Sequence, residues 1–464
     1  MEGDRVPTMQ RMKQIPTMPR AMRSPASIET HELYKKLHLL QCISKYTAPR
    51  EPVSQEQQQN LDKQELRRSF TDQIAYLCDG SKDGSTTTAV FLQDGKMRNH
   101  TLWFATNETV DPRIRHFLEW VIGEALKNIT KKSRESIEKD LLDRSTAIAS
   151  NRIEFYRKQM ILFAGECLKQ LIWSNGSAPS GQAKKLIRWI KDLKGIEWHN
   201  KLSTVCYEAR GEGREQSLIA AQKGSAEDCF AELAHYIGRL GAHLFAVKTI
   251  VRAALMLPTI KSIAEVQYEE CPDSQVLQVD LGLGGPYEML RSIVDSQNCH
   301  PFQKLQILQN FAKIDLEQDI TGRFRPKGKT TLAIKTFVHA ELQLYDLASR
   351  RDLPFVEDDR YVGCSKPACY FCQRYSKSHP KDFVEPPSHH KVLLGVRAPA
   401  ANPNLDVRGK GAAILCMAQS NMEWKVEQDI LQALSPMNNS ISFQHCSTDG
   451  FNRAPMTVTT QFDR

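Results

Sequence analysis

Four residues with the chemistry of a metal site stand close together in two pairs in this 464-residue sequence. His339 and Glu341 are two positions apart, and Cys369 and Cys372 are three positions apart. Thiolate sulfur and imidazole nitrogen are preferred ligands of Zn²⁺, and catalytic sites with three protein ligands keep the fourth position open for water. We therefore predict one zinc ion per chain, bound by His339, Cys369 and Cys372. Water on such an ion is acidic near neutral pH, and Glu341 is the predicted acid and base that transfers its proton.

The two cysteines follow Pro367, a residue type that is favoured in the first turn of a helix. Side chains three positions apart share one face of a helix, so both thiols are expected at the N-terminus of a helix that starts at Pro367. The helix dipole favours thiolate there. Two alternatives stay open: a structural zinc site that Cys364 or His379 closes as fourth ligand, and thiols that bind no metal. For Cys364, an inert core cysteine in an expected strand is the simpler interpretation.

An H-x-E motif followed by P-C-x-x-C is typical of zinc deaminases. On residues 338–341 and 363–372 the sequence resembles the cytidine-deaminase-like superfamily, in particular a divergent branch that is abundant in fungi and found in some bacterial toxins, with HAE and SKxxCxxC motifs. The resemblance covers residues 327–400. It implies a zinc-dependent hydrolytic deaminase with an α/β three-layer sandwich, in which helices enclose a mixed sheet. One departure is the alanine between Pro367 and Cys369, since the better-known members place proline directly before the cysteine.

Six further residues are candidates for contact with the substrate. They are Ser365, Lys366, Tyr370, Phe371, Arg323 and Arg325. The serine and the lysine belong to the second motif of the resemblance. The two aromatic residues could stack on a base, and packing in a core explains them at least as well. The two arginines lie in a basic loop shortly before His339, where contact with phosphate and plain solvation are both open.

Hydrophobic periodicity divides the chain into parts of different character. We expect a disordered arm and linker at residues 1–60, a β-hairpin region at 61–110, an α-helical domain or insertion at 111–320, a zinc deaminase-like domain at 321–435 and a flexible tail at 436–464. The expected fold class is an α/β deaminase-like sandwich combined with a large α-helical region. The resemblance implies a hairpin at the start of the sheet, and none directly precedes His339. We expect strands at 86–93 and 101–107 to supply it, with the helical region as an insertion.

Around the two motifs the pattern alternates between helix and strand. We expect a helix at 339–349, a strand at 360–363, a helix from Pro367, a strand at 391–396 and a last helix at 422–434. His389 and His390 precede the second of these strands, and we interpret them as polar loop residues.

The charge balance permits an anionic partner without requiring one. The chain has 62 Lys and Arg against 54 Asp and Glu, a net charge of +8. Basic residues recur at helical spacing between apolar ones at Lys184, Lys185, Arg188, Lys191 and Lys194. This pattern is typical of the solvated side of an amphipathic helix.

The overall composition is that of a globular protein, with 41% hydrophobic and 25% charged residues. The apolar stretch 244–260 is interrupted by Lys248 and Arg252, so it is too short to span a bilayer. Residues 1–27 lack the apolar segment of a secretory signal, and twelve cysteines are too few for a disulfide scaffold of this length. We expect an intracellular protein, cytoplasmic or nuclear, without a membrane partner.

Two functions fit these residues. The first is a zinc hydrolase that removes an exocyclic amine from a nucleobase, in a free nucleotide or in single-stranded nucleic acid. The second is a non-catalytic interaction protein whose deaminase-like module keeps a structural zinc while the helical region binds a protein partner. An open fourth zinc position that solvent reaches favours the enzyme, and a cysteine in that position favours the interaction protein.

Overall fold

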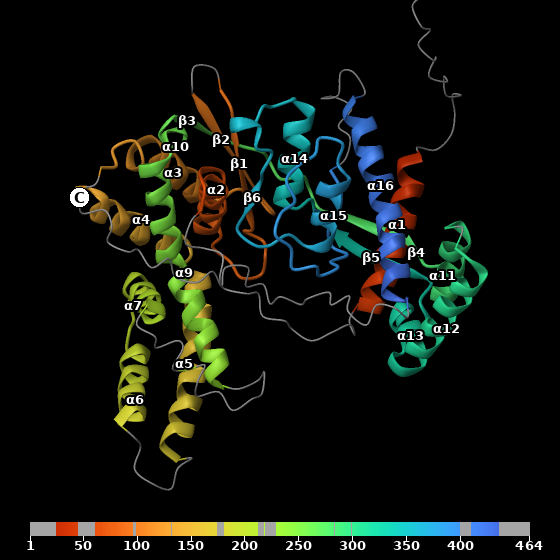
Figure 1. Ribbon diagram of the computed structural model, residues 1–464, viewed down its shortest axis with the longest axis horizontal. Helices are drawn as coiled ribbons and strands as arrows, with labels where there is room; N and C mark the ends of the chain where they lie inside the picture. The colour runs from red at the N-terminus through yellow and green to blue at the C-terminus, as the bar shows by residue number, and fades with distance from the viewer. Residues whose placement is uncertain are drawn as a thin grey trace, which may run out of the picture.

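The computed structural model describes residues 25–44, 61–95, 99–130, 132–173, 181–211, 218, 229–282, 284–297, 299–399 and 410–435. The expectations for the arm at 1–24, the linker at 45–60 and the tail at 436–464 fall outside these ranges. The described chain combines many helices with a small mixed sheet, as Figure 1 shows. The expected mixture of helix and sheet is therefore present.

The strands form two sheets. The larger contains β1 (Thr88–Gln93), β2 (His100–Thr106), β3 (Ile263–Tyr268) and β6 (Gly363–Cys364) in the order β3-β2-β1-β6. β1 and β2 form an antiparallel hairpin, β3 runs parallel to β2, and β6 runs antiparallel to β1. The smaller sheet pairs β4 (Gln275–Asp280) with β5 (Thr331–Thr336) in antiparallel register. The hairpin thus lies beside the strand that leads into the second motif.

The helices supply the rest of the regular structure. They are α1 (Pro25–Ser44), α2 (Lys63–Cys78), α3 (Pro112–Trp120), the π-helix η2 (Val121–Ala125), α4 (Arg134–Ile148), α5 (Ser150–Trp173), α6 (Gly181–Lys194), α7 (His199–Gly211), α9 (Cys229–Met256), α10 (Pro258–Lys261), α11 (Gly285–Ser296), α12 (Pro301–Gln318), α13 (Ile320–Phe324), α14 (Ala340–Arg350), α15 (Tyr370–Ser378) and α16 (Lys410–Ala433), with short 3₁₀ turns at Pro326–Gly328 and Val356–Asp358.

The sheet is covered on both faces because the hairpin strands alternate their apolar side chains. β1 reads TAVFLQ and β2 reads HTLWFAT, a composition rich in β-branched and aromatic residues. Phe91 and Trp103 enter the core that contains α14, whereas Val90 and Phe104 enter the core that contains α2 and α9. α14 therefore packs on one face of the hairpin, and α2 and α9 pack on the other.

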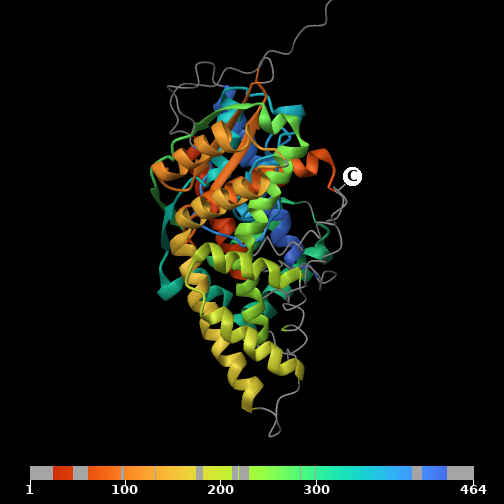
Figure 2. The ribbon, with the colours of Figure 1, turned by 90° about the vertical axis from the view of Figure 1, so that its left-hand side faces the viewer.

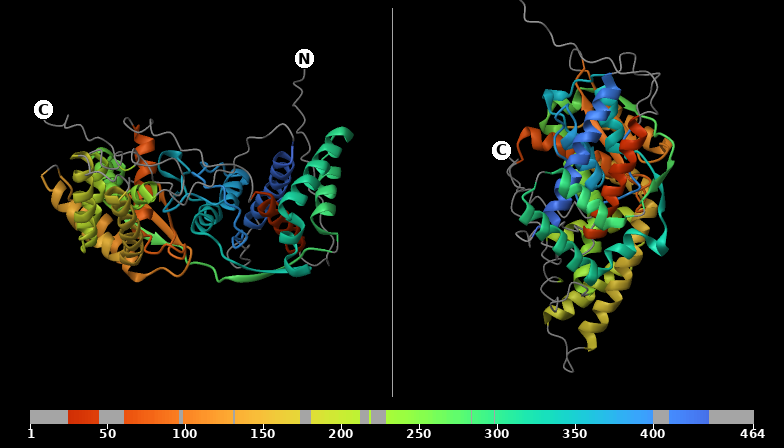
Figure 3. Two further views of the ribbon diagram at one scale, coloured as in Figure 1. Left: turned by 90° about the horizontal axis from the view of Figure 1, so that it is seen from below. Right: turned by 90° about the vertical axis from the view of Figure 1, so that its right-hand side faces the viewer.

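Helices α5, α6, α7 and the first part of α9 form an arm with its own apolar core. This arm projects from the rest of the molecule in Figures 1 and 2, and Figure 3 places α11 and α12 at the opposite end. Within the part of the chain that the structure describes, none of the helices combines the length and apolar character that crossing a membrane requires.

Several local expectations differ from the structure. The strand expected at 391–396 is absent, and only Val396 makes a β-bridge, to Phe337. The segment contacts two different neighbours instead of one strand, because Lys391 O accepts from the Tyr370 N–H and Gly395 O accepts from the Phe337 N–H.

Element boundaries also shift. The second-motif helix begins at Tyr370 rather than at Pro367, and the strand before it is Gly363–Cys364 rather than 360–363. The range 111–320, expected to be helical, contains β3 and β4. These strands pair with β2 and β5, which are distant in sequence, so the local spacing of apolar residues carries no signal for them.

We predict that Gly363→Ala destabilises the protein, because Gly363 places β6 directly against α2. An added Cβ would lie 2.6 Å from Thr71 Oγ1 and 2.7 Å from Asp72 N. The expected loss is about 1–3 kcal/mol of unfolding free energy, measured as a shift of the urea midpoint. Gly123→Ala is the control, because no atom lies within 4 Å of a Cβ there. An equal response of both variants would contradict close packing at Gly363.

Candidate metal centre

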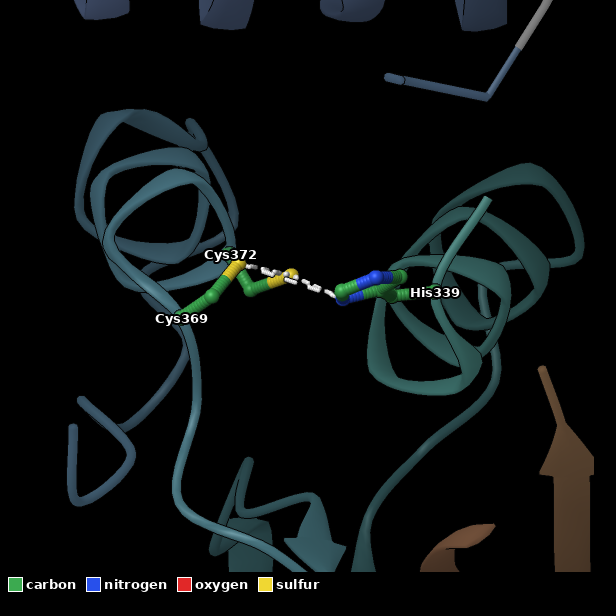
Figure 4. A group of neighbouring side chains, drawn as sticks. All are labelled: His339, Cys369 and Cys372. Atoms are coloured by element: carbon green, nitrogen blue, oxygen red, sulfur yellow. Dashed lines mark hydrogen bonds between the residues drawn. The ribbon is translucent and has the colours of Figure 1, made fainter. Parts of the chain in front are cut away.

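Three potential metal ligands converge from the starts of two helices. His339 directly precedes α14, Cys369 directly precedes α15, and Cys372 lies in the first turn of α15. The two Sγ atoms are 3.5 Å apart, and His339 Nδ1 lies 3.4 Å from Cys372 Sγ and 3.9 Å from Cys369 Sγ (Figure 4). Their ligand atoms all lie within 4.8 Å of one another, close enough to hold one metal ion.

The distances fit a tetrahedral metal. With Zn–S bonds of about 2.3 Å and Zn–N bonds of about 2.0 Å, tetrahedral geometry separates two sulfurs by about 3.8 Å and a sulfur from a nitrogen by about 3.5 Å. The two sulfur–nitrogen distances, 3.4 and 3.9 Å, bracket the expected value, and the sulfur–sulfur distance of 3.5 Å is slightly shorter than expected. His339 places its Nδ1 atom beside both sulfurs, so the three side chains can bind one metal ion.

Neither candidate for a fourth protein ligand joins this group among the described residues. His379 Nε2 lies 3.2 Å from Ser349 Oγ, and its Nδ1 accepts a hydrogen bond from the Lys381 N–H. Cys364 lines the cleft described below, and burial raises the pKa of its thiol well above the ordinary value. This arrangement disfavours a structural site closed by Cys364 or His379.

The electrostatics of the group favour binding of a cation. Burial disfavours ionisation of both thiols, and with the adjacent Cys369 it raises the pKa of Cys372 well above its ordinary value. Burial also acts on Cys369, but hydrogen bonds from Cys372 and His339 outweigh it and hold the pKa of Cys369 well below its ordinary value. For His339, burial opposes the charged form and the contact with Cys369 more than offsets it, so the pKa of His339 is raised. A metal ion would replace the protons that this cluster shares.

Glu341 lies beside the group with an unused hydrogen-bond acceptor. The side chain is 3% exposed, and its Oε2 has no hydrogen-bond partner among the described residues. Burial raises the pKa of Glu341, and the charge of His339 opposes this rise only in part. A buried carboxyl group with a raised pKa at the wall of a cleft is the arrangement of a group that exchanges protons.

His339, Cys369 and Glu341 line a cleft of about 470 Å³. This volume is within the range of small-molecule sites. Three segments that are distant in sequence build its walls: the loop around Lys82 after α2, Asn107 after β2, and Lys366 in the second motif. Lys366 was predicted to contact substrate, and its ammonium group also lies 3.2 Å from Asp79 Oδ2.

The other predicted substrate contacts lie away from the cleft. Tyr370 and Phe371 are buried in the apolar core, so packing rather than base stacking accounts for them. Ser365 is also buried, and its Oγ accepts a hydrogen bond from the Thr88 N–H, which ties the second motif to β1.

The basic loop before His339 is likewise engaged elsewhere. Arg325 donates a hydrogen bond to the Gly282 carbonyl, and Arg323 Nε donates to the Asp319 carbonyl. Neither arginine is among the residues that line the cleft. The structure therefore gives no support to a phosphate contact by these two residues at this site.

His389 lines the cleft although its sequence context indicated only a polar loop. It is 7% exposed, and burial lowers its pKa to about 4, so the imidazole is neutral near pH 7. Its Nδ1 accepts the Lys391 N–H, and its own N–H donates to the Ala368 carbonyl. No local sequence signal exists for this placement, because it depends on pairing between two loops.

Asn107 also reaches the site without a sequence signal. The side chain of His339 at the N-cap of α14 makes no capping hydrogen bond. Asn107 Oδ1 instead accepts the Ala340 N–H at 2.8 Å, and Asn107 Nδ2 donates to the Gly84 carbonyl at 2.9 Å. Because His339 directs its ring toward the cysteines, a residue from the hairpin supplies the cap.

Residues 338–400 match the model of the OTT_1508-like deaminase family. No curated protein and no solved structure matches the chain. The matched segment is a small part of the 464 residues and contains the three potential metal ligands and Glu341. The match supports a deaminase family for this segment and hydrolytic deaminase activity in general.

We predict that the isolated protein binds one zinc ion per chain and that Cys369→Ala and His339→Ala both lose it. Each substitution removes one of three ligands, which leaves too few for stable binding. Inductively coupled plasma mass spectrometry on purified protein measures the metal. Cys364→Ala is the matched control, because it removes a cleft thiol outside the group. Loss of metal in Cys364→Ala would instead indicate a closed structural site.

Asn107→Ala should weaken the start of α14, because it removes the acceptor for the Ala340 N–H. We expect a loss of about 0.5–2 kcal/mol of unfolding free energy, as for other lost helix caps. Asn107→Asp keeps the acceptor and places a negative charge at the helix N-terminus, so most of the stability should return. Thermal unfolding of the metal-free protein measures both variants. Equal loss in both would show that the bond to Gly84, not the cap, is the important contact.

Proposed function

We propose that the chain is a zinc-dependent deaminase that removes an exocyclic amine from a nucleobase by hydrolysis. The observation that carries this proposal is the position of Glu341, a buried carboxyl group with an unpartnered oxygen on a cleft that His339 and Cys369 of the His–Cys–Cys group also line. The family match over residues 338–400 supports the same reaction class. A purely structural metal site would have no use for such an acid.

The residues divide the chemistry between them. His339, Cys369 and Cys372 would hold the zinc ion, which supplies a water ligand that is acidic near neutral pH. Glu341 would accept one proton of that water through its unpartnered oxygen and deliver it to the ring nitrogen, and would then pass the second proton of the water to the departing amine, which leaves as ammonia. Its raised pKa suits this exchange, because burial makes the carboxylate a better proton acceptor than an exposed glutamate.

The proposed catalytic fold is a deaminase-like three-layer sandwich assembled from two separate parts of the chain. The hairpin region 61–110 supplies the first strands, and 321–435 supplies the helices that carry the ligands. The pairing of β1 with β6, directly before the second motif, supports this assignment. Residues 111–320 are then an insertion that contributes the arm and returns β3 to the edge of the sheet.

The substrate is proposed to be a nucleobase in a nucleotide or in single-stranded nucleic acid, and the location to be intracellular, cytoplasmic or nuclear. Cys369 and Cys372 form no disulfide with each other, and free thiols in a possible metal site are typical of proteins in reducing compartments. The alternative, an interaction protein with a structural zinc, requires a fourth protein ligand. Neither Cys364 nor His379 provides it in the described structure.

Glu341→Gln is the decisive variant. The amide keeps the size of the side chain but cannot accept the proton, so we expect zinc content to be unchanged and turnover to fall by a factor of about 10²–10⁴. Ammonia release is measured with cytosine and adenine nucleosides, nucleotides and single-stranded oligonucleotides. Retained turnover, or loss of zinc from this variant, would contradict the role assigned to Glu341.

A further inference from the structure

One face of α6 concentrates positive charge. The helix reads GQAKKLIRWIKDLK and holds five basic residues and one acidic residue, which amounts to half of the net charge of +8. Lys184, Lys185, Arg188 and Lys191 are all exposed. At 100° per residue they lie on one side of the helix and span about two turns, or roughly 10 Å along the axis. We call these four residues the α6 basic face.

The α6 basic face forms no ion pair within the described part of the chain, although the exposed Asp192 lies on the same side of the helix, four positions after Arg188. None of the four forms an ion pair with an acidic side chain there. Other exposed cations behave differently: Arg113 pairs with Asp111, and Lys139 pairs with Asp143. Unpaired like charges on neighbouring turns repel one another, so an anionic ligand along this face would relieve the repulsion.

The opposite face of α6 is already used for packing. Trp189, Ile190 and Leu193 are at most 7% exposed and belong to the core of the arm. A helix that inserts into a membrane surface needs its apolar face free. That face is buried here, so α6 presents charge without an apolar surface, as a protein surface that contacts phosphates does.

The arm connects this face to the cleft. Lys82, which lines the cleft, places its ammonium group 3.7 Å from the centre of the Phe155 ring near the start of α5. Farther along α5, the Lys194 ammonium group at the end of α6 lies 3.8 Å from the position of a Cβ on Gly165. The ten residues from Phe155 to Gly165 measure about 15 Å of helix, and Lys191, the member of the α6 basic face that is nearest in sequence to Lys194, lies about 4.5 Å of helical rise beyond it. A few nucleotides of extended strand can cover such a length at about 3.4 Å or more each.

We propose that the α6 basic face binds the phosphate backbone of a single-stranded nucleic acid whose target base enters the cleft. The inference rests on the proposed function, because the cleft gives a reason for a nucleobase-bearing polymer to lie along the arm. The substrate of the site is then a polymer rather than a free nucleotide. Lys184, Arg188 and Lys191 contact successive phosphates, and the strand runs from α6 along α5 toward Lys82.

The test is the salt dependence of binding. Fluorescence anisotropy with a labelled single-stranded RNA or DNA of about 20 nucleotides is measured at increasing KCl concentration. Each phosphate contact adds about 0.7 to the slope of log K against log salt. The triple variant K184Q/R188Q/K191Q should therefore lower the slope by about 2. Glutamine and lysine have similar helix propensity, and thermal unfolding verifies that α6 is retained.

The matched control is R113Q/R115Q/K139Q, which removes the same charge from exposed residues that have acidic partners. It should bind like the wild type. Equal weakening in both variants would show a general charge effect and overturn the assignment to α6. No salt-dependent binding by the wild type would overturn it as well. Stronger binding of the wild type to phosphatidylserine vesicles or to poly-glutamate than to the oligonucleotide would assign the face to another anion.

Measuring oligonucleotide binding and ammonia release together distinguishes a failure of the α6 binding proposal from a failure of the proposed deaminase function. Glu341→Gln should keep the salt slope of the wild type, because it leaves the phosphate contacts of the α6 basic face intact. If the wild type releases no ammonia from any base but still binds through α6, the proposed deaminase function fails and the binding face stands. If it deaminates free nucleotides and oligonucleotides with equal kcat/KM, and the triple variant does the same, the polymer substrate is refuted while the deaminase stands.

Discussion

Both helices that supply the potential metal ligands are anchored at their N-terminal ends to one β-hairpin. At β6, Val90 and Ala89 pair with Gly363 and Cys364, and the next residue, Ser365, exchanges two hydrogen bonds with Thr88. The chain then has only a few residues to cover before it reaches α15. At the other helix, Asn107 caps α14 from the end of the same hairpin. Separations of 3.4–3.9 Å between ligand atoms require this common anchor, because neither helix packs extensively on the other.

Buried ion pairs also attach the helical region to the second motif. Asp79, at the end of α2, is fully buried and lies 3.2 Å from both Arg152 on α5 and Lys366 in the second motif. Removing one partner from a buried ion pair costs about 3–5 kcal/mol, because the remaining charge stays in the interior. The arm is therefore attached to the cleft by a polar contact that tolerates little change, and not only by apolar packing.

The sequence was informative where chemistry and local propensity decide the outcome. His339, Cys369 and Cys372 could be selected from residue type and spacing, and the hairpin could be predicted from the β-branched and aromatic content of its strands. The residues that complete the cleft could not be predicted in this way. Asn107 and His389 reach it through contacts with segments distant in sequence, and β3 and β4 depend on partners more than 50 residues away. In each case the deciding interaction joins separate parts of the chain, so no window of neighbouring residues contains it.

Helix α9 belongs to two cores at once. Its first part, including Leu233 and Leu240, packs in the core of the arm, and its second part, including Val247 and Ile250, packs beneath the sheet. One continuous helix of 28 residues thus joins the arm to the layer beneath the sheet without a loop between them. A hinge would require breaking the backbone hydrogen bonds of this helix in its buried middle. The arm is consequently held at a set distance from the sheet by the continuous backbone of α9.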